Sequence, residues 1–207
     1  MSIKAILTCD IVNSTKLTPA KEQKLITCIK EIFVTHKIEF FRGDSFQVYV
    51  KEPENALQLS LLCRIAAMKL YKEQQAQVVD VRISIGIGEV KLPVKVLTTA
   101  KGEAFLLSGR TFDKIAKTNQ RLIISINNQL ANEGLNVISD YLNDILHKIT
   151  AKQAEVIFDL LEGKTQQAIA KKIKKTKSTI HQLATAGQWP QIEKLLQQYI
   201  NIIKLVQ

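Results

Sequence analysis

Cysteine and histidine are scarce in this chain, with three of each among 207 residues. Cys9, Cys28 and Cys63 are odd in number, lie far apart in the sequence and form no CxxC pair, and no histidine has a second plausible ligand beside it. Disulfide frameworks and structural zinc sites need paired or clustered ligands of these types. The sequence therefore argues against a disulfide-stapled or zinc-centred fold.

Long apolar runs are missing as well. No segment reaches the roughly 18 consecutive apolar residues that a transmembrane helix needs. The first residues offer one lysine and only about seven residues that could form the apolar part of a secretion signal, with no small-residue cleavage pattern after them. We expect a soluble cytoplasmic protein without a membrane partner.

Apolar residues and positive charge are abundant. Hydrophobic residues make up 46% of the chain and charged residues 23%, which is enough for a sizeable core and one or two domains. Lysine and arginine outnumber aspartate and glutamate by 29 to 19, a formal net charge of +10. This excess favours an anionic partner such as nucleic acid, phosphates or an acidic membrane surface. The alternative is a generally basic cytosolic protein.

Hydrophobic periodicity predicts alternating strands and helices in the first 90 residues. Two short β-rich runs flank Arg42-Gly43-Asp44, which indicates a hairpin. We predict, in chain order, a strand at 2–9, a helix at 17–36, strands at 38–41 and 45–50, a helix at 53–74 and a strand at 78–90. This β-α-β-β-α-β order is typical of an α+β, ferredoxin-like fold.

The connection rules of such a fold bring two distant carboxylates together. A right-handed crossover makes the first two strands parallel and leaves the third between them, antiparallel to both. Asp10, at the end of the first strand, then lies beside Asp44 in the hairpin. Two adjacent carboxylates repel unless a cation lies between them or one of them binds a proton. A hard cation such as Mg²⁺ satisfies them; neutralisation by Arg42 or a nearby lysine is the alternative.

The order of motifs in residues 3–125 resembles that of class III nucleotidyl cyclases, whose core has this topology. The motifs are DIVNST, GDSF, VRISIGIGEV and GEAFLLSGR. The resemblance is closer still to the SatD family, a bacterial group with a cyclase-like N-terminal domain, and GDSFQVYVKEPENALQLSL is its most specific stretch. We therefore assign residues 1–126 to a cyclase-like α/β domain.

The cyclase resemblance implies a role for each matching residue. Ligands of Mg²⁺ or Mn²⁺ would be Asp10, Asp44 and the carbonyl of Ile11. Nucleotide contacts would come from the backbone of Asn13, Ser14 and Thr15 and from Arg110. N–H groups near a helix start attract phosphates, and an arginine at the place of Arg110 stabilises the transition state in cyclases. A surface ion pair is the alternative role for Arg110.

Three positions depart from the cyclase pattern. Leu106 stands where cyclases carry a catalytic asparagine, Phe40 where a lysine reads adenine, and Thr99 approximately where that lysine has an acidic partner. Losing one prearranged polar stabiliser costs about 3 kcal/mol, a factor of about a hundred in rate. We therefore expect binding of a nucleotide or another phosphorylated ligand rather than efficient cyclase chemistry. A domain that binds nothing is the alternative.

The last third of the chain is predicted to be helical after a strand that begins near Arg121. Residues 127–147 are predicted to form linking helices broken near Gly134, and residues 148–207 a helix-turn-helix domain with a C-terminal helix. Thr150 can cap the first helix of that domain, and Gly163 ends it. The next segment resembles a helix-turn-helix of the sigma-factor region-four or LuxR type, in which two helices would bury Ile169, Ala170, Ile173, Ile180 and Leu183. In this pattern Lys174 stands where glycine often makes the turn, and Lys175 where an apolar residue is common.

Lysines concentrate in the same segment. The segment from Lys148 to Ala184 contains eight lysines and three acidic residues. Its net positive charge is about half of that of the whole chain. A helix-turn-helix places the start of its second helix in the major groove. Candidates for base contacts are Lys177, Ser178, Thr179, His181 and Gln182. Candidates for phosphate contacts are Lys171, Lys172, Lys174 and Lys175. A basic helical pair used for protein contacts is the alternative.

The C-terminal helix carries a continuous apolar stripe, formed by Ile192, Leu195, Leu196, Tyr199, Ile202 and Ile203. Such a stripe needs a partner. We expect it to close over the helix-turn-helix core, with Trp189 as a wedge, or to pair with a second copy of the chain. A homodimer is favoured because symmetric dimers suit palindromic operators.

Together these patterns predict a DNA-binding transcriptional regulator whose degenerate cyclase-like domain senses a nucleotide or a metal ion. Its partner would be double-stranded DNA. The alternative is a metal-dependent nucleotidyl cyclase or a related nucleotide-processing enzyme. A third hypothesis is an adaptor that uses the basic helices to bind an acidic protein.

Overall fold

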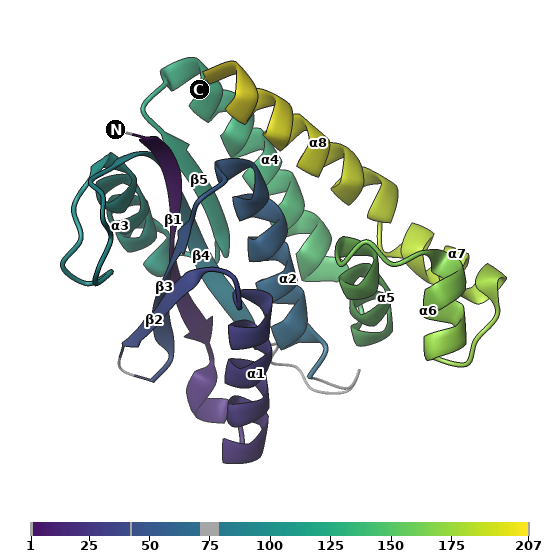
Figure 1. The fold of residues 1–207 in the computed structure, drawn as a ribbon. Helices are drawn as coiled ribbons and strands as arrows, with labels where there is room; N and C mark the ends of the chain where they lie inside the picture. Colours follow the sequence, from purple (N-terminus) through teal and green to yellow (C-terminus); the bar gives the residue numbers. More distant parts are fainter. Residues whose placement is uncertain (1, 42, 71–78, 207) are drawn as a thin grey trace.

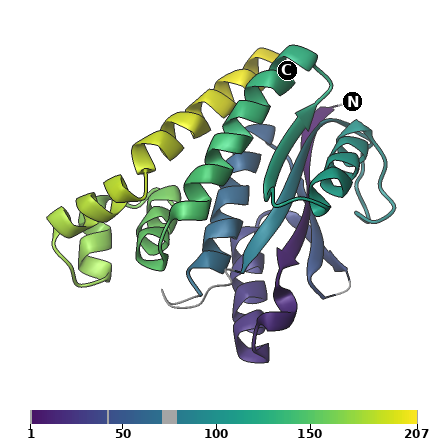
Figure 2. The ribbon, with the colours of Figure 1, turned by 180° about the vertical axis from the view of Figure 1, so that it is seen from behind.

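A computed structural model describes residues 2–41, 43–70 and 79–206 (Figures 1 and 2). The elements, in chain order, are β1 (Ser2–Val12), η1 (Ser14–Lys16), α1 (Pro19–Ile32), β2 (Lys37–Phe41), β3 (Ser45–Val50), η2 (Pro53–Asn55), α2 (Ala56–Met68), β4 (Asp80–Val90), α3 (Glu103–Ala116), β5 (Leu122–Ile126), α4 (Gln129–Lys148), α5 (Ala151–Leu161), α6 (Gln166–Lys172), α7 (Lys177–Ala186) and α8 (Trp189–Val206). The mixed α+β character agrees with the sequence prediction. Arg42 and the predicted end of the helix at 53–74 lie outside the described residues. Among the residues described, no helix combines the length and the apolar character needed to cross a bilayer.

The strands form one sheet in the order β2-β3-β1-β4-β5. β3 lies between β1 and β2 and pairs antiparallel with both of them. β4 pairs antiparallel with the other side of β1, and β5 pairs parallel with β4. The position of β3 is the one that the crossover rule predicted, and it places the β2–β3 turn beside the end of β1.

The two faces of the sheet are covered by different helices. Ala5, Leu7 and Cys9 alternate along β1 toward the main core, which includes α1 and α2. Ile6 faces the other way, into a small cluster with Ala104 of α3. Because strand side chains alternate, Thr8 and Asp10 lie on the same face as Ile6. Figure 1 shows α3 on one side of the sheet and α2 and α4 on the other.

A buried ion pair connects the main core to α4. The Arg64 side chain of α2 donates hydrogen bonds from Nε and Nη2 to the two carboxylate oxygens of Asp80, at 3.1 and 2.8 Å. Its Nη1 donates to the Asn143 side chain of α4 at 3.0 Å. Arg64 is 1% exposed and Asp80 7%. The planar guanidinium matches the carboxylate with two parallel bonds, so this contact fixes α2, β4 and α4 relative to one another.

α4 is one uninterrupted helix, so the predicted break near Gly134 is wrong. The Asn128 side chain accepts a hydrogen bond from the Ala131 N–H and caps its start. A Cβ at Gly134 would lie 3.1 Å from Cδ1 of Ile202 in α8. The glycine therefore allows α8 to pack closely against α4, and it does not end the helix.

α8 lies along α4, as Figures 1 and 2 both show. Ile192, Tyr199 and Ile203 of its apolar stripe are buried in the main core. The Tyr199 hydroxyl donates a 2.6 Å hydrogen bond to the carbonyl of Pro53. The stripe therefore packs on the main core, which includes residues of α5, and among the described residues of α8 Trp189 alone also contacts the small cluster of α6 and α7. The stripe also no longer argues for a homodimer, which stays a prediction.

α5, α6 and α7 surround a second, smaller core. Its buried residues are Val156, Ile169, Ala170, Ile180 and Ala184, with Ile173 and Leu183 partly buried beside them. The predicted contact positions of the two short helices thus do pack together. Thr150 caps α5 in a capping box with Gln153, and Gly163 follows the helix with a left-handed φ of 79°.

Candidate functional site

The predicted carboxylates do meet, at the end of β1. Asp10 lies within β1, which extends to Val12 instead of ending at Cys9, and pairs in register with Ser45. The Ile11 N–H donates to the carbonyl of Asp44 at 3.0 Å. The Ser45 hydroxyl lies 3.3 Å from Asp10 Oδ1 and 3.5 Å from Asp44 Oδ1. One hydroxyl therefore bridges the two carboxylates.

Each carboxylate has a second partner that sequence reasoning missed. Arg82, opposite Asp10 in β4, places Nη1 3.3 Å from Asp10 Oδ2. The Ser14 hydroxyl donates to Asp44 Oδ2 at 2.8 Å. Arg82 is the single charged residue in the mainly apolar stretch 81–88 of β4, and this was the signal in the sequence that could have identified it. Its Nε is buried without a hydrogen-bond partner among the described residues.

The positive charge of Arg82 balances the negative charge of the two carboxylates only in part. Burial, and then the negative charge of Asp44, raise the pKa of Asp10, against the lowering effects of Arg82 and Ser45. A raised carboxyl pKa means that the folded state binds the proton more tightly than the unfolded chain does. Ionising Asp10 therefore lowers stability as pH rises through its pKa. A divalent cation would relieve this cost, and carboxylate and hydroxyl oxygens are ligands that Mg²⁺ accepts.

A hollow of about 340 Å³ opens beside Asp44. Ser14, Thr15 and Glu22 line it. Asn13, just before η1, has a left-handed φ of 60°, and its carbonyl accepts the Lys16 N–H. Three predicted phosphate contacts thus lie in one turn next to the carboxylates. Arg110 is exposed on α3, and no described ion pair joins it to either carboxylate.

None of the three positions that depart from the cyclase pattern is among the described residues that line this hollow. Phe40 stacks on Phe46, with ring centroids 5.0 Å apart, on the face of the sheet that α1 covers. Leu106 is half exposed on α3, and Thr99 is exposed in the β4–α3 connection. Phe40 is thus a packing residue on the face opposite Asp10.

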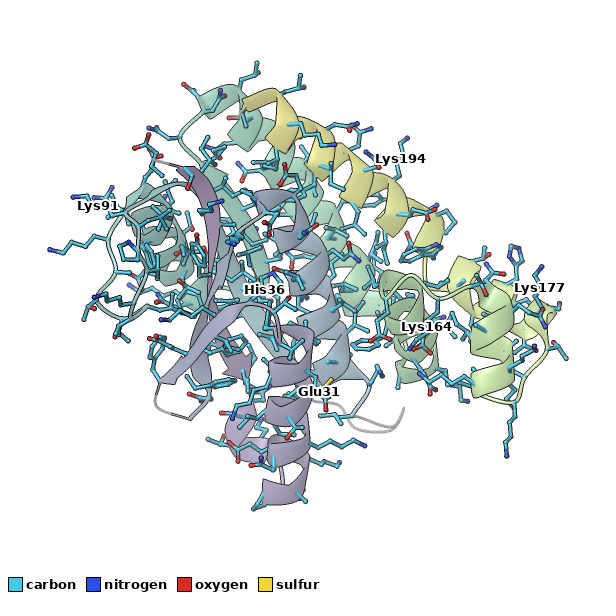
Figure 3. All side chains as sticks on the ribbon, in the orientation of Figure 1. Glu31, His36, Lys91, Lys164, Lys177 and Lys194 are labelled. Atoms are coloured by element: carbon cyan, nitrogen blue, oxygen red, sulfur yellow. The ribbon has the colours of Figure 1, made fainter. Side chains whose placement is uncertain are left out.

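The surface of α6 and α7 displays most of the predicted DNA contacts. Exposed side chains are Lys171, Lys172, Lys174, Lys175, Lys177, Ser178, His181 and Gln182, while Thr179 is half-buried. The Thr176 side chain caps α7 by accepting the Thr179 N–H at 3.1 Å. Lys174 has a left-handed φ of 54°, the conformation that glycine adopts most easily. Figure 3 shows Lys177 at the end of the molecule farthest from Lys91.

Lys172 differs from the other candidates because its ammonium group is already paired. It donates to both oxygens of Asp159 in α5, at 2.7 and 2.8 Å. Lys164 donates to the same carboxylate at 2.8 Å. Burial alone would raise the pKa of Asp159, but the hydrogen bonds from both lysines outweigh it and lower the pKa. Lys172 therefore fastens α6 to α5.

Comparisons with known proteins give only distant likenesses. No family model and no curated protein matches this chain. Similar solved structures include a bacterial light-regulated adenylyl cyclase, with 17% identity, a TM-score of 0.43 and coverage of 59% of this chain and 43% of that one. The guanylyl cyclase Cya2 has 18% identity, a TM-score of 0.40 and coverage of 60% and 75%.

The active GGEEF domain of a diguanylate cyclase from Vibrio cholerae has 13% identity, a TM-score of 0.43 and coverage of 62% and 85%. The chain spans less than half of the light-regulated adenylyl cyclase. Likenesses at this level do not identify a function. Membership of the SatD family stays a prediction.

Proposed function

We propose that this protein binds double-stranded DNA through a helix-turn-helix formed by α6 and α7, and that it acts as a transcriptional regulator. The observation that carries the proposal is the cationic surface of these helices. Lys171, Lys174, Lys175 and Lys177 are all exposed around the turn and the start of α7. Phosphate contacts by such lysines supply affinity, whereas polar side chains on the inserted helix read the bases.

The packing of α7 supports this use. Ile180 and Ala184 are buried against α5 and α6. Their burial holds one face of α7 inward and leaves Ser178, His181 and Gln182 on the outer face. A ten-residue helix is about 15 Å long, enough to cross the major groove.

The test compares two variants that lose the same charge. Lys174→Ala/Lys175→Ala/Lys177→Ala removes three lysines at the turn, and Lys91→Ala/Lys95→Ala/Lys101→Ala removes three exposed lysines of the β4–α3 connection. Each lost phosphate contact reduces the slope of log K against log salt by about 0.9. We expect the first variant to lose about 2 to 3 units of slope and the second to keep the wild-type slope. Fluorescence anisotropy on the protein's own upstream DNA and on scrambled duplex measures both.

Equal slopes for the two variants, or no binding even at low salt, would overturn DNA binding at this surface. The adaptor hypothesis predicts the second result. Wild-type affinity that is the same on both duplexes would show general rather than operator-specific binding, since specific sites typically bind about 10³-fold or more tightly.

A second candidate function is cation-assisted binding of a phosphorylated ligand at the end of β1. The convergence of Asp10 and Asp44 on the Ser45 hydroxyl is the observation that favours it. Asp10 and Asp44 would hold Mg²⁺ or Mn²⁺, which would supply positive charge for a phosphate. Asn13, Ser14 and Thr15 would position that phosphate in the adjacent hollow. Turnover as a cyclase is not expected, because Phe40 and Leu106 offer no polar group.

Thermal unfolding tests this candidate. We expect Mg²⁺ at ten times its dissociation constant to stabilise the wild type by about 1.4 kcal/mol through mass action, and Asp44→Asn to abolish the gain. Glu89→Gln, an exposed carboxylate near the opposite end of β4, is the matched control. An identical Mg²⁺ effect in Asp44→Asn would rule the site out. Product formed from a nucleoside triphosphate with Mn²⁺, and lost in Asp44→Ala, would establish the enzyme alternative.

A further inference from the structure

A separate cavity of about 360 Å³ lies where the first helices of the chain meet α5. α1 contributes Lys24 and Cys28, the residue after α2 is Lys69, and α5 contributes Lys152 and Glu155. None of these residues belongs to the carboxylate pair or to the exposed surface of α6 and α7. The volume is at the lower end of the range for small-molecule sites.

The floor of this cavity is apolar. Leu25 of α1 and Ala66 of α2 are buried, and both line it. Cys28 is half-buried there, whereas Cys9 and Cys63 are fully buried in the core. A ligand would therefore rest a flat or apolar body against the floor, next to one accessible thiol.

The rim of the cavity is cationic. Among the described residues that line the cavity, Lys24, Lys69 and Lys152 are the cations and Glu155 is the one carboxylate. The Lys69 ammonium lies 3.6 Å from the centroid of the Phe158 ring in α5, which fixes its position. Burial lowers the pKa of Lys69, the repulsion of Lys172 adds to this, and nearby Cys28, Asp159 and Glu155 act against it. An anion in the cavity would stabilise the charged ammonium.

We propose that this cavity binds a small phosphorylated molecule with a flat or apolar body. The phosphate contacts the rim lysines, and the body lies on Leu25 and Ala66. Because α1 and α2 form one side and α5 the other, the bound molecule fixes the α5–α7 unit against the first helices. Regulation of DNA binding by this molecule rests on the proposed function, but the binding site itself does not.

Cys28 provides a local readout. Alkylation of the full-length protein by iodoacetamide, followed residue by residue with mass spectrometry, measures occupancy of the cavity. We expect AMP and phenyl phosphate to slow the alkylation of Cys28 at least about fivefold, at concentrations about tenfold below those that inorganic phosphate needs. Cys9 and Cys63 report on unfolding, since they stay unmodified while the core is intact.

Two lysine variants make the test specific. Lys69→Met keeps the length of the side chain and its packing on Phe158, and we expect it to lose the protection. Lys30→Met removes an exposed lysine of α1 that lies outside the cavity, and protection should remain.

The proposal is overturned if neither organic phosphate protects Cys28 at about 10 mM, or if Lys69→Met and Lys30→Met are protected equally. DNA affinity with and without AMP is measured separately by anisotropy. Protection without DNA binding would leave the cavity assigned and would overturn only the proposed regulator.

Discussion

Arg64→Met is expected to lower the free energy of unfolding by about 3–5 kcal/mol. The substitution keeps the volume of the side chain but removes the guanidinium that both oxygens of Asp80 accept from. A buried carboxylate would then remain without its cation, and Asn143 Oδ1 would lose the hydrogen bond that Arg64 donates. Urea denaturation, with the slope m unchanged, measures the loss.

The double variant Arg64→Met/Asp80→Val is the matched control. Removing both charges eliminates the uncompensated ion, so the double variant should be more stable than the single one. A loss below about 1 kcal/mol in Arg64→Met would contradict this account, because it would mean that water reaches Asp80.

Gly86→Ala is expected to destabilise the protein by about 3 kcal/mol through overpacking. A Cβ at Gly86 of β4 would lie 2.3 Å from the carbonyl oxygen of Ala104 and 2.4 Å from the backbone nitrogen of Ser108. Both are backbone atoms of α3, so no side-chain rotation can relieve the contact. α3 must move away from the sheet, which also strains the 3.0 Å hydrogen bond between Thr8 and Ser108.

Gly109→Ala, in α3 itself, has the opposite expected sign. No atom of the described residues outside α3's own backbone lies within 4 Å of a Cβ at Gly109, and alanine in a helix interior is favoured over glycine by about 0.8–1 kcal/mol. Thermal or urea unfolding of the two variants compares them directly. Equal effects would show that the approach of α3 to β4 is not tight at Gly86.

Local patterns were sufficient for the order of elements in the first 90 residues and for the meeting of Asp10 and Asp44. Alternating apolar residues and the turn at Gly43 indicate strands. The crossover rule then gives the order of the first three strands in the sheet. The end of β1 was missed because Asp10 interrupts the apolar run after Cys9, whereas pairing with β4 continues to Val12, which lies opposite Asp80. The length over which a strand pairs depends on its partner strand, and the hydropathy of one segment does not predict that length.

The partners of charged residues were harder to predict. Arg82 reaches Asp10 because the β1–β4 register sets them opposite each other, and that register is absent from either segment alone. Arg64 and Asp80 meet only after α2 packs on the sheet. Gly134 was misread for a similar reason: glycine ends many helices, but here it admits Ile202 of a helix far along the chain.

The position of α8 affects how the chain folds while it is being synthesised. Tyr199 binds the carbonyl of Pro53, a residue made 146 positions earlier. Chains are made at about 5–20 residues per second. On the ribosome, the helices around Pro53 would therefore keep part of their apolar surface uncovered for several seconds, until α8 has been made. We therefore expect the nascent chain to leave this part of the main core open to aggregation and chaperone binding until Ile192, Tyr199 and Ile203 have emerged.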